Sequence, residues 1–148
     1  MSAKKVYVMG QSGDKEFEGA KLALFIDGLL LVIRRDDRPG LPWPGYLDLP
    51  GGGKEPGETP ELCVLRETHE EVGLRLAADQ LIWRRYYPDD PTPAWFFAAH
   101  LPGSAQDDIR FGSEGQGWAL MPPEDFVAHD EAVPHFRLRV QDYLTGRT

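Results

Sequence analysis

The segment 51–74 constrains this chain of 148 residues more than any other part of its sequence. It opens with a triple glycine, and further on it carries Glu67 followed three and four residues later by Glu70 and Glu71. On a helix with about 100° of rotation per residue, these three carboxylates fall within an arc of roughly 100°. Carboxylates packed this closely repel one another, and a bound cation would turn that repulsion into a binding site. The segment therefore predicts a glycine loop followed by a helix with an acidic, cation-binding face.

Residues suited to both ends of a helix flank this acidic stretch. Thr59 can cap the N-terminus, and Pro60 suits the first helical position. Gly73 can end the helix in a left-handed conformation. We therefore predict a helix over residues 60–72. The apolar side chains expected to pack this helix on a sheet are Leu62, Leu65 and Val72.

The charged and glycine positions of the segment follow a fixed spacing. From Gly52 the order is glycine, five residues, glutamate, seven residues, Arg-Glu, two residues, Glu-Glu, one residue, glycine and an aliphatic residue. The residues at these positions are Gly52, Glu58, Arg66, Glu67, Glu70, Glu71, Gly73 and Leu74. This pattern resembles the Nudix box, the signature of the Nudix hydrolases. Thr68 is the one departure, because an aliphatic residue is usual there, and it bears on helix packing more than on chemistry.

The resemblance implies a fold and a reaction. Nudix domains are α+β proteins, an α/β/α sandwich with a mixed β-sheet between helices, and the box helix lines the catalytic cleft. Nudix enzymes cleave a nucleoside diphosphate linked to another group. Such a diphosphate repels nucleophiles, so hydrolysis requires neutralised phosphate oxygens, an activated water and a stabilised leaving group. We therefore predict a metal-dependent nucleotide pyrophosphohydrolase, with Mg2+ or Mn2+ as cofactor, in one domain spanning residues 1–148.

The resemblance and the carboxylate spacing together indicate the site residues. The expected metal-binding residues are Glu67, Glu70, Glu71, Glu58 and, through its backbone, Gly52. The expected catalytic residues are Arg66, which can hold a carboxylate in place, with Glu67, Glu70 and Glu114. Glu114 is included because Nudix proteins often place one more glutamate in a late loop, as a metal ligand or general base. The identity of the general base stays open among Glu67, Glu70 and Glu114.

Residues before the box are candidates for substrate binding. Arg34 and Arg35 end the strand that leads toward the cleft, and one of them can contact a phosphate. Trp43, in a proline-rich loop, can stack on a base. Pro88 and Pro91 bracket the position of a proline typical of ADP-sugar enzymes without matching it. The expected substrate is therefore only a nucleoside di- or triphosphate derivative.

The rest of the sequence alternates strand patterns with turn residues. Asp27-Gly28 between two apolar runs predicts a β-hairpin. Strands are expected at residues 4–9, 20–26, 29–34, 46–49, 80–87, 94–101 and 118–121, and loops at 36–45 and 103–117. A short helix is expected from Pro122. The C-terminal helix is expected over 134–144, with one apolar side formed by Phe136, Val140, Tyr143 and Leu144.

Composition argues against several classes of partner. The net charge of −8 argues against nucleic-acid binding through a basic surface. No long apolar run or signal-like N-terminus is present, so we expect a cytoplasmic protein without a membrane partner. The lone Cys63 forbids an internal disulfide and is expected to pack on the helix. The expected partner is a small nucleoside diphosphate derivative, and a homodimer is left open.

Two other functions fit the residues less well. A Nudix-fold domain that binds or senses nucleotides without catalysis usually lacks box glutamates, and all four are present here. A Nudix isopentenyl diphosphate isomerase usually needs a catalytic cysteine before the box, whereas Cys63 lies inside it. Hydrolysis is therefore the prediction, and a catalytically inactive nucleotide-binding or sensor domain is the alternative.

Overall fold

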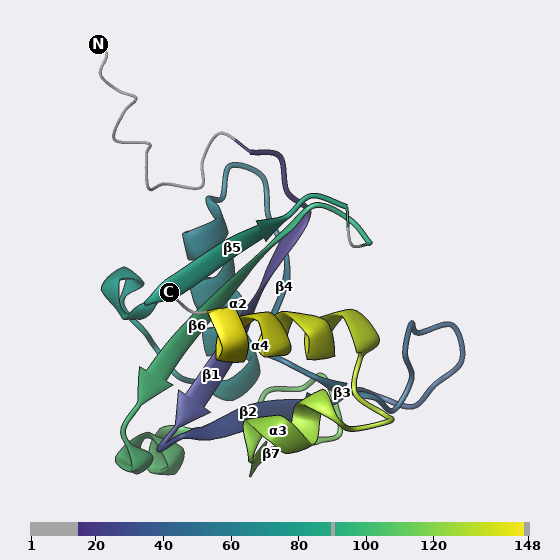
Figure 1. Cartoon of the computed structure of the whole chain (residues 1–148), viewed down its shortest axis with the longest axis vertical. Helices are drawn as coiled ribbons and strands as arrows, with labels where there is room; N and C mark the ends of the chain where they lie inside the picture. Colours follow the sequence, from purple (N-terminus) through teal and green to yellow (C-terminus); the bar gives the residue numbers. More distant parts are fainter. Residues whose placement is uncertain (1–14, 90, 147–148) are drawn as a thin grey trace.

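The computed structural model describes residues 15–89 and 91–146 (Figure 1). Its strands are β1 (Gly19–Ile26), β2 (Leu29–Arg34), β3 (Leu47–Asp48), β4 (Gly51–Gly53), β5 (Trp83–Tyr87), β6 (Ala94–Leu101) and β7 (Gly117–Met121). They form one sheet in the order β3-β2-β1-β6-β5, with β4 paired to β1 and β7 paired to β2. The sheet is mixed, because β1 and β6 are parallel and the other pairs are antiparallel.

Helices cover both faces of this sheet. The helices are α2 (Pro60–Val72), α3 (Pro123–Val127) and α4 (Pro134–Gly146), with short 3-10 turns η1 (Ala78–Gln80) and η2 (Gly103–Asp108). In Figure 1, α4 crosses in front of β1 and β6, whereas α2 lies behind them. Alternate residues of β1 point to the two sides: Leu22 and Leu24 join the core beneath α2, whereas Ala23 and Phe25 join the core beneath α3 and α4. This arrangement confirms the predicted α/β/α sandwich with a mixed sheet.

Most predicted elements occur near their expected positions. The β1–β2 hairpin turns at Asp27 and Gly28, whose φ angles of 53° and 82° are both left-handed, as a tight hairpin requires. The strand expected at residues 80–87 begins only at Trp83, after the 3-10 turn η1. The loop expected at 103–117 contains η2, and the strand expected at 46–49 is reduced to two residues. The strand expected at residues 4–9 lies outside the described residues.

Helix α2 has the predicted bounds, but the predicted packing face was partly wrong. Leu62 is 57% exposed and Leu65 is only partly buried. The stripe that faces the sheet is formed by Pro60, Cys63, Val64, Thr68 and Val72. Apart from the adjacent Cys63 and Val64, its members follow one another at intervals of three or four residues, as one helix face requires. This stripe runs beside Glu67 and Glu71 instead of opposite them, so packing of the helix brings those two glutamates toward the sheet.

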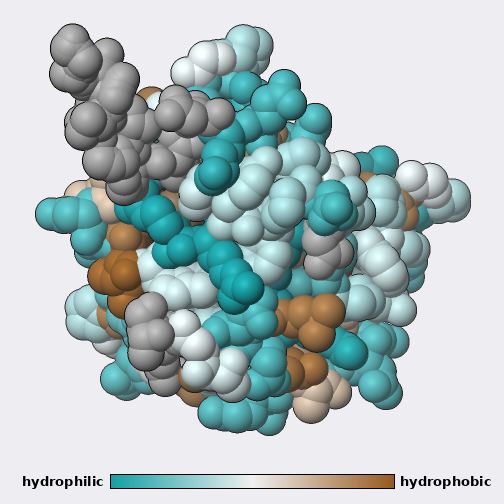
Figure 2. Space-filling model, turned by 45° about the horizontal axis from the view of Figure 1, so that its top comes forward, coloured by the Kyte–Doolittle hydropathy of each residue, from teal (hydrophilic) through white to brown (hydrophobic). Residues whose placement is uncertain are grey.

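The surface seen in Figure 2 is mainly hydrophilic, and its hydrophobic residues form small separate groups. Among residues 15–89 and 91–146, none of the helices combines the length and the apolar composition that crossing a bilayer requires.

The apolar side of α4 is as predicted, because Phe136, Val140 and Tyr143 are buried and Leu144 packs against the same core. Arg139 is also buried on this helix, where its guanidinium lies 4.5 Å from the centre of the Tyr87 ring.

Candidate active site

The triple glycine forms strand β4, which runs between β1 and helix α2. Gly51 pairs with Lys21 and has a φ of 130°, and a Cβ atom at this position would lie 2.2 Å from the Ala20 carbonyl oxygen. A Cβ atom on Gly52 would lie 2.8 Å from the carboxylate of Glu67. Glycine is therefore required at position 51, where the β1 backbone leaves no room for a side chain, whereas a side chain at position 52 would displace the Glu67 carboxylate. A loop was expected for these glycines, and the structure shows a strand instead.

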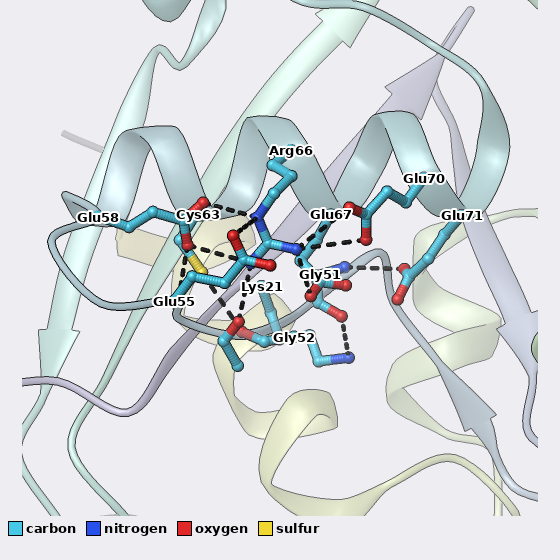
Figure 3. Close-up of polar contacts among 11 residues, drawn as sticks. Lys21, Gly51, Gly52, Glu55, Glu58, Cys63, Arg66, Glu67, Glu70 and Glu71 are labelled. Carbon is cyan, nitrogen blue, oxygen red and sulfur yellow. Dashed lines mark hydrogen bonds and ion pairs between the residues drawn. The ribbon is translucent and has the colours of Figure 1, made fainter.

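Arg66, on α2, contacts three of the box glutamates (Figure 3). Its guanidinium makes a two-pronged ion pair with Glu58, at 2.6 and 3.0 Å, and also donates to Glu67 at 3.1 Å and to Glu70 at 3.2 Å. A further N–H donates to the Gly53 carbonyl oxygen at 3.0 Å. The ion pair lowers the pKa of Glu58, and the surrounding carboxylates raise the pKa of Arg66. Arg66 thus connects the helix, the loop before it and strand β4.

Glu71 is held differently from the other box glutamates. Its Oε1 accepts a hydrogen bond of 3.0 Å from the Gly51 N–H. Burial raises the pKa of Glu71 to about 8, although the positive charge of Lys21 and the Gly51 hydrogen bond both lower it. A divalent cation beside this carboxylate would supply the positive charge that its buried position lacks.

A cavity of about 340 Å³ lies between α2, the glycine strand and the loops that follow β2 and precede β7. Several predicted site residues line it together: Arg35, Gly52, Glu67, Glu71 and Glu114. Glu114 comes from far along the chain, and its loop is fastened to the end of β2. The Gly115 N–H donates to Asp36 at 3.2 Å, and the Gln116 side chain donates to the Arg35 carbonyl oxygen at 2.8 Å.

Other predicted site residues lie outside this cavity. Glu70, whose side chain is 55% exposed, lines a separate hollow on the outer side of α2. Glu58, which precedes the helix, forms an ion pair with Arg66. Arg34 points to another hollow and donates to the Gly45 carbonyl oxygen at 2.6 Å. Trp43 is 40% exposed and contacts the Tyr46 ring, and it does not line the cavity.

Lys21, Asp36, Arg38 and Asp48 are charged residues of the cavity that were not predicted from the sequence, and two of them lie on strands. Lys21 lies on β1, and Asp48 lies on β3 with only 6% of its surface exposed. Asp48 accepts from Arg35 at 2.7 Å and from Lys21 at 3.1 Å. The signal was present in the sequence, because each is a single charge within an apolar strand, in the runs Ala20–Ile26 and Leu47–Leu49. A buried charge of this kind needs partners, and these are usually other site residues.

The donor atoms around the cavity suit a hard divalent cation such as Mg2+ or Mn2+. Carboxylate oxygens of Glu67 and Glu71 and the Gly52 backbone border the same space, and the lack of a Cβ at Gly52 keeps that backbone open. Within the part of the chain that the structure describes, no three Asp, Glu, His or Cys side chains already converge as a ready ligand cluster. Three of the box glutamates, Glu58, Glu67 and Glu70, instead form ion pairs with Arg66.

Comparison with known proteins identifies the family. The NUDIX domain profile matches residues 19–141. An RNA pyrophosphohydrolase of Gluconobacter oxydans (strain 621H) is 35% identical over 121 residues, which cover 76% of this chain and 69% of that protein. The nucleoside triphosphatase NudI of Escherichia coli O81 (strain ED1a) is 32% identical over 114 residues, covering 70% and 80% of the two chains. The chain therefore belongs to the Nudix family, as its box predicted.

Solved structures agree at the level of the fold. The MutT protein from Methanosarcina mazei Go1 superposes with a TM-score of 0.69 at 18% identity, covering 91% of this chain and 98% of that one. A C. elegans Ap4A hydrolase gives a TM-score of 0.66 at 21% identity, covering 86% and 96%. Family and fold together confirm the prediction of a Nudix hydrolase, an enzyme class that acts on phosphoanhydride bonds.

Proposed function

We propose that this chain is a Nudix pyrophosphohydrolase that requires Mg2+ or Mn2+ and cleaves the diphosphate linkage of a nucleoside di- or triphosphate derivative. One observation carries the proposal: Glu67 and Glu71 of α2 and Glu114 of the loop before β7 border the same cavity as Gly52. The relatives named as RNA pyrophosphohydrolase and nucleoside triphosphatase support a phosphorylated nucleotide as the substrate. A cytoplasmic location and a single domain over residues 1–148 stay predictions, and a homodimer stays open.

The residues of the cavity divide the work of such a reaction. A divalent cation held by Glu67, Glu71, Glu114 and the Gly52 backbone would neutralise phosphate charge and favour ionisation of a bound water. Glu67 and Glu114 are the better candidates for the general base, because Glu70 lines a different hollow. A base must come within hydrogen-bond reach of the water that it deprotonates. Arg66 fixes the orientation of Glu67 through their 3.1 Å contact.

Two arginines of the cavity are placed to receive the phosphates of the substrate. Arg35 and Arg38 both line it, and Asp48 holds Arg35 at 2.7 Å. Guanidinium groups suit phosphate oxygens because their N–H donors match the spacing of two oxygens. Of the two arginines considered from sequence, we therefore propose Arg35 and not Arg34 as the phosphate contact.

The proposal is tested by incubating the protein with a panel of nucleotides and Mg2+ or Mn2+ and identifying the products by mass spectrometry. The panel contains nucleoside triphosphates, oxidised nucleotides, 5′-triphosphorylated RNA, dinucleoside polyphosphates, ADP-ribose and sugar nucleotides. Reaction in 18O-labelled water shows which phosphorus is attacked, because the label enters one product only. We expect hydrolysis of one class, with complete loss of turnover after thorough chelation.

Variants connect that activity to the site. Glu67→Gln and Glu71→Gln are expected to abolish turnover while the circular dichroism spectrum stays unchanged. Glu124→Gln on α3 is the matched control, because Glu124 is exposed and does not line the cavity. Unchanged turnover in both box variants would disprove the metal site. Nucleotide and metal binding without hydrolysis of any panel member would instead favour the nucleotide-binding alternative.

A further inference from the structure

Lys21 reaches from the middle of the sheet to the glycine strand. It lies on β1, opposite Gly51 in the pairing of β1 with β4, and its side chain is 17% exposed. Figure 3 shows this side chain beside Gly51 and Gly52, and Lys21 lines the same cavity as Glu67 and Glu71. Lys21 is thus a cation at the edge of the proposed catalytic cavity, where a lysine is usually expected to bind substrate phosphate.

The contacts of Lys21 argue against that role. An ammonium group has three N–H donors. The Lys21 Nζ lies 3.1 Å from Asp48 Oδ1, 3.1 Å from the Leu49 carbonyl oxygen and 3.0 Å from the Gly51 carbonyl oxygen. All three donors are matched by acceptors within residues 48–51, the short turn that joins β3 to β4. Binding a phosphate would require Lys21 to give up at least one of these contacts.

The 48–51 turn, which Lys21 holds, also orients Glu71. The Gly51 N–H donates to Glu71 Oε1 at 3.0 Å, while the Gly51 carbonyl oxygen accepts from Lys21. Gly51 occupies the left-handed region, with a φ of 130°, so the orientation of the peptides on both of its sides depends on the surrounding contacts. Lys21 is therefore connected to Glu71 through one residue, and both side chains depend on the conformation of that residue.

We propose that Lys21 is a positioning residue, which fixes the 48–51 turn so that the Gly51 N–H directs the Glu71 carboxylate into the cavity where a divalent cation binds. This inference rests on the proposed function, because it gives Glu71 a cation to bind. Lys21 also brings a positive charge that partly offsets the acidic cluster before a cation arrives. Groups that orient a metal ligand commonly change metal affinity or activity by about 10- to 100-fold when they are removed.

Chemical restoration of the lysine tests this role. Lys21→Cys removes the ammonium group, and alkylation of the new thiol with 2-bromoethylamine restores a side chain of lysine length with its charge. The reaction is selective, because the native Cys63 is fully buried and burial raises the pKa of its thiol to about 12. Alkylation with iodoacetamide gives a neutral side chain of similar length and serves as the matched comparison.

The first measurement is Mn2+ binding to the substrate-free protein, by calorimetry. We expect Lys21→Cys to bind Mn2+ about 10- to 100-fold more weakly, the aminoethylated protein to recover most of that loss, and the iodoacetamide product to recover none. Lys15→Cys, at an exposed position, is treated identically and should bind like wild type throughout. Lys21→Met, which fills a similar volume, takes the place of the cysteine variant if that variant does not fold.

Kinetics then separate positioning from substrate binding. At saturating Mn2+, a positioning role lowers kcat and leaves KM for the nucleotide nearly unchanged. Wild-type Mn2+ affinity in the Lys21 variant would overturn the inference, and a raised KM with unchanged kcat would overturn it and make Lys21 a phosphate contact. The Mn2+ measurements do not depend on turnover, so they decide the role of Lys21 even if no nucleotide of the panel is hydrolysed.

Discussion

Replacing Glu71 with glutamine should stabilise the metal-free protein at neutral and alkaline pH, although it removes a site residue. Burial raises the pKa of Glu71 from an ordinary value of 4.5 to about 8. Between these two pH values the unfolded chain has lost the Glu71 proton, whereas the folded protein retains it. The wild-type protein therefore becomes less stable as the pH rises through this window, and glutamine, which does not ionise, avoids that cost.

The size of the effect follows from the displacement of the pKa. At about 1.4 kcal/mol for each pH unit, a change from 4.5 to about 8 corresponds to at most roughly 5 kcal/mol. Because the Glu71 side chain is not completely shielded from water, we expect about half of this value, roughly 2–3 kcal/mol. Glutamine has nearly the same shape, and its oxygen can still accept the hydrogen bond from the Gly51 N–H.

Urea unfolding at a series of pH values, in the presence of a chelator, measures this difference. The free energies of unfolding of Glu71→Gln and wild type should be nearly equal close to pH 4.5, separate up to about pH 8 and stay apart by a constant amount above it. Glu124→Gln, at an exposed position, should show no such separation. A difference that does not depend on pH, or one that favours the wild type, would refute the reasoning. Added Mn2+ should stabilise the wild type and leave Glu71→Gln almost unchanged.

Three further substitutions test contacts of the box helix. Thr68→Val should raise the free energy of unfolding by about 1 kcal/mol, because the buried Thr68 hydroxyl makes no hydrogen bond and valine has the same shape; urea unfolding without any gain would contradict this. Arg66→Lys should lower kcat at least about tenfold, because an ammonium group cannot reproduce the two-pronged ion pair of Arg66; wild-type kinetics would show that the ion pairs are dispensable. Gly52→Ala should lower kcat by on the order of 100-fold, since the added Cβ would lie 2.8 Å from the Glu67 carboxylate; full activity in a folded variant would exclude this crowding.

Elements bounded by specific local signals could be predicted from sequence. The bounds of α2 were correct because each end has its own signal: Thr59 accepts from the Leu62 N–H at 3.2 Å, and Gly73 has a φ of 78°. The β1–β2 hairpin was correct because Asp27-Gly28 favours the left-handed turn that such a hairpin needs. Grouping of the box glutamates near a glycine segment likewise follows from spacing along one helix.

Features that depend on contacts between distant segments could not be predicted in this way. Strand β4 exists because β1 offers it a partner, and three glycines carry no strand propensity of their own. Arg34 and Arg35 are adjacent in sequence, so their side chains leave the chain on opposite sides, and only the assembled sheet decides which side faces the cavity. The exposure of Leu62 also depends on tertiary packing, because the helix turns the stripe that contains Cys63 and Val64 toward the sheet.

Repulsion among the glutamates is offset within the protein itself. From the spacing we expected a bound cation to turn this repulsion into a binding site, and Arg66 to hold a carboxylate in place. In the structure the protein supplies its own cations: Arg66 pairs with three glutamates, while Lys21 and the Gly51 N–H lower the cost of burying Glu71. A metal ion must then compete with Arg66 for Glu67, so the strength of the Arg66 ion pairs helps to set the metal affinity of the site.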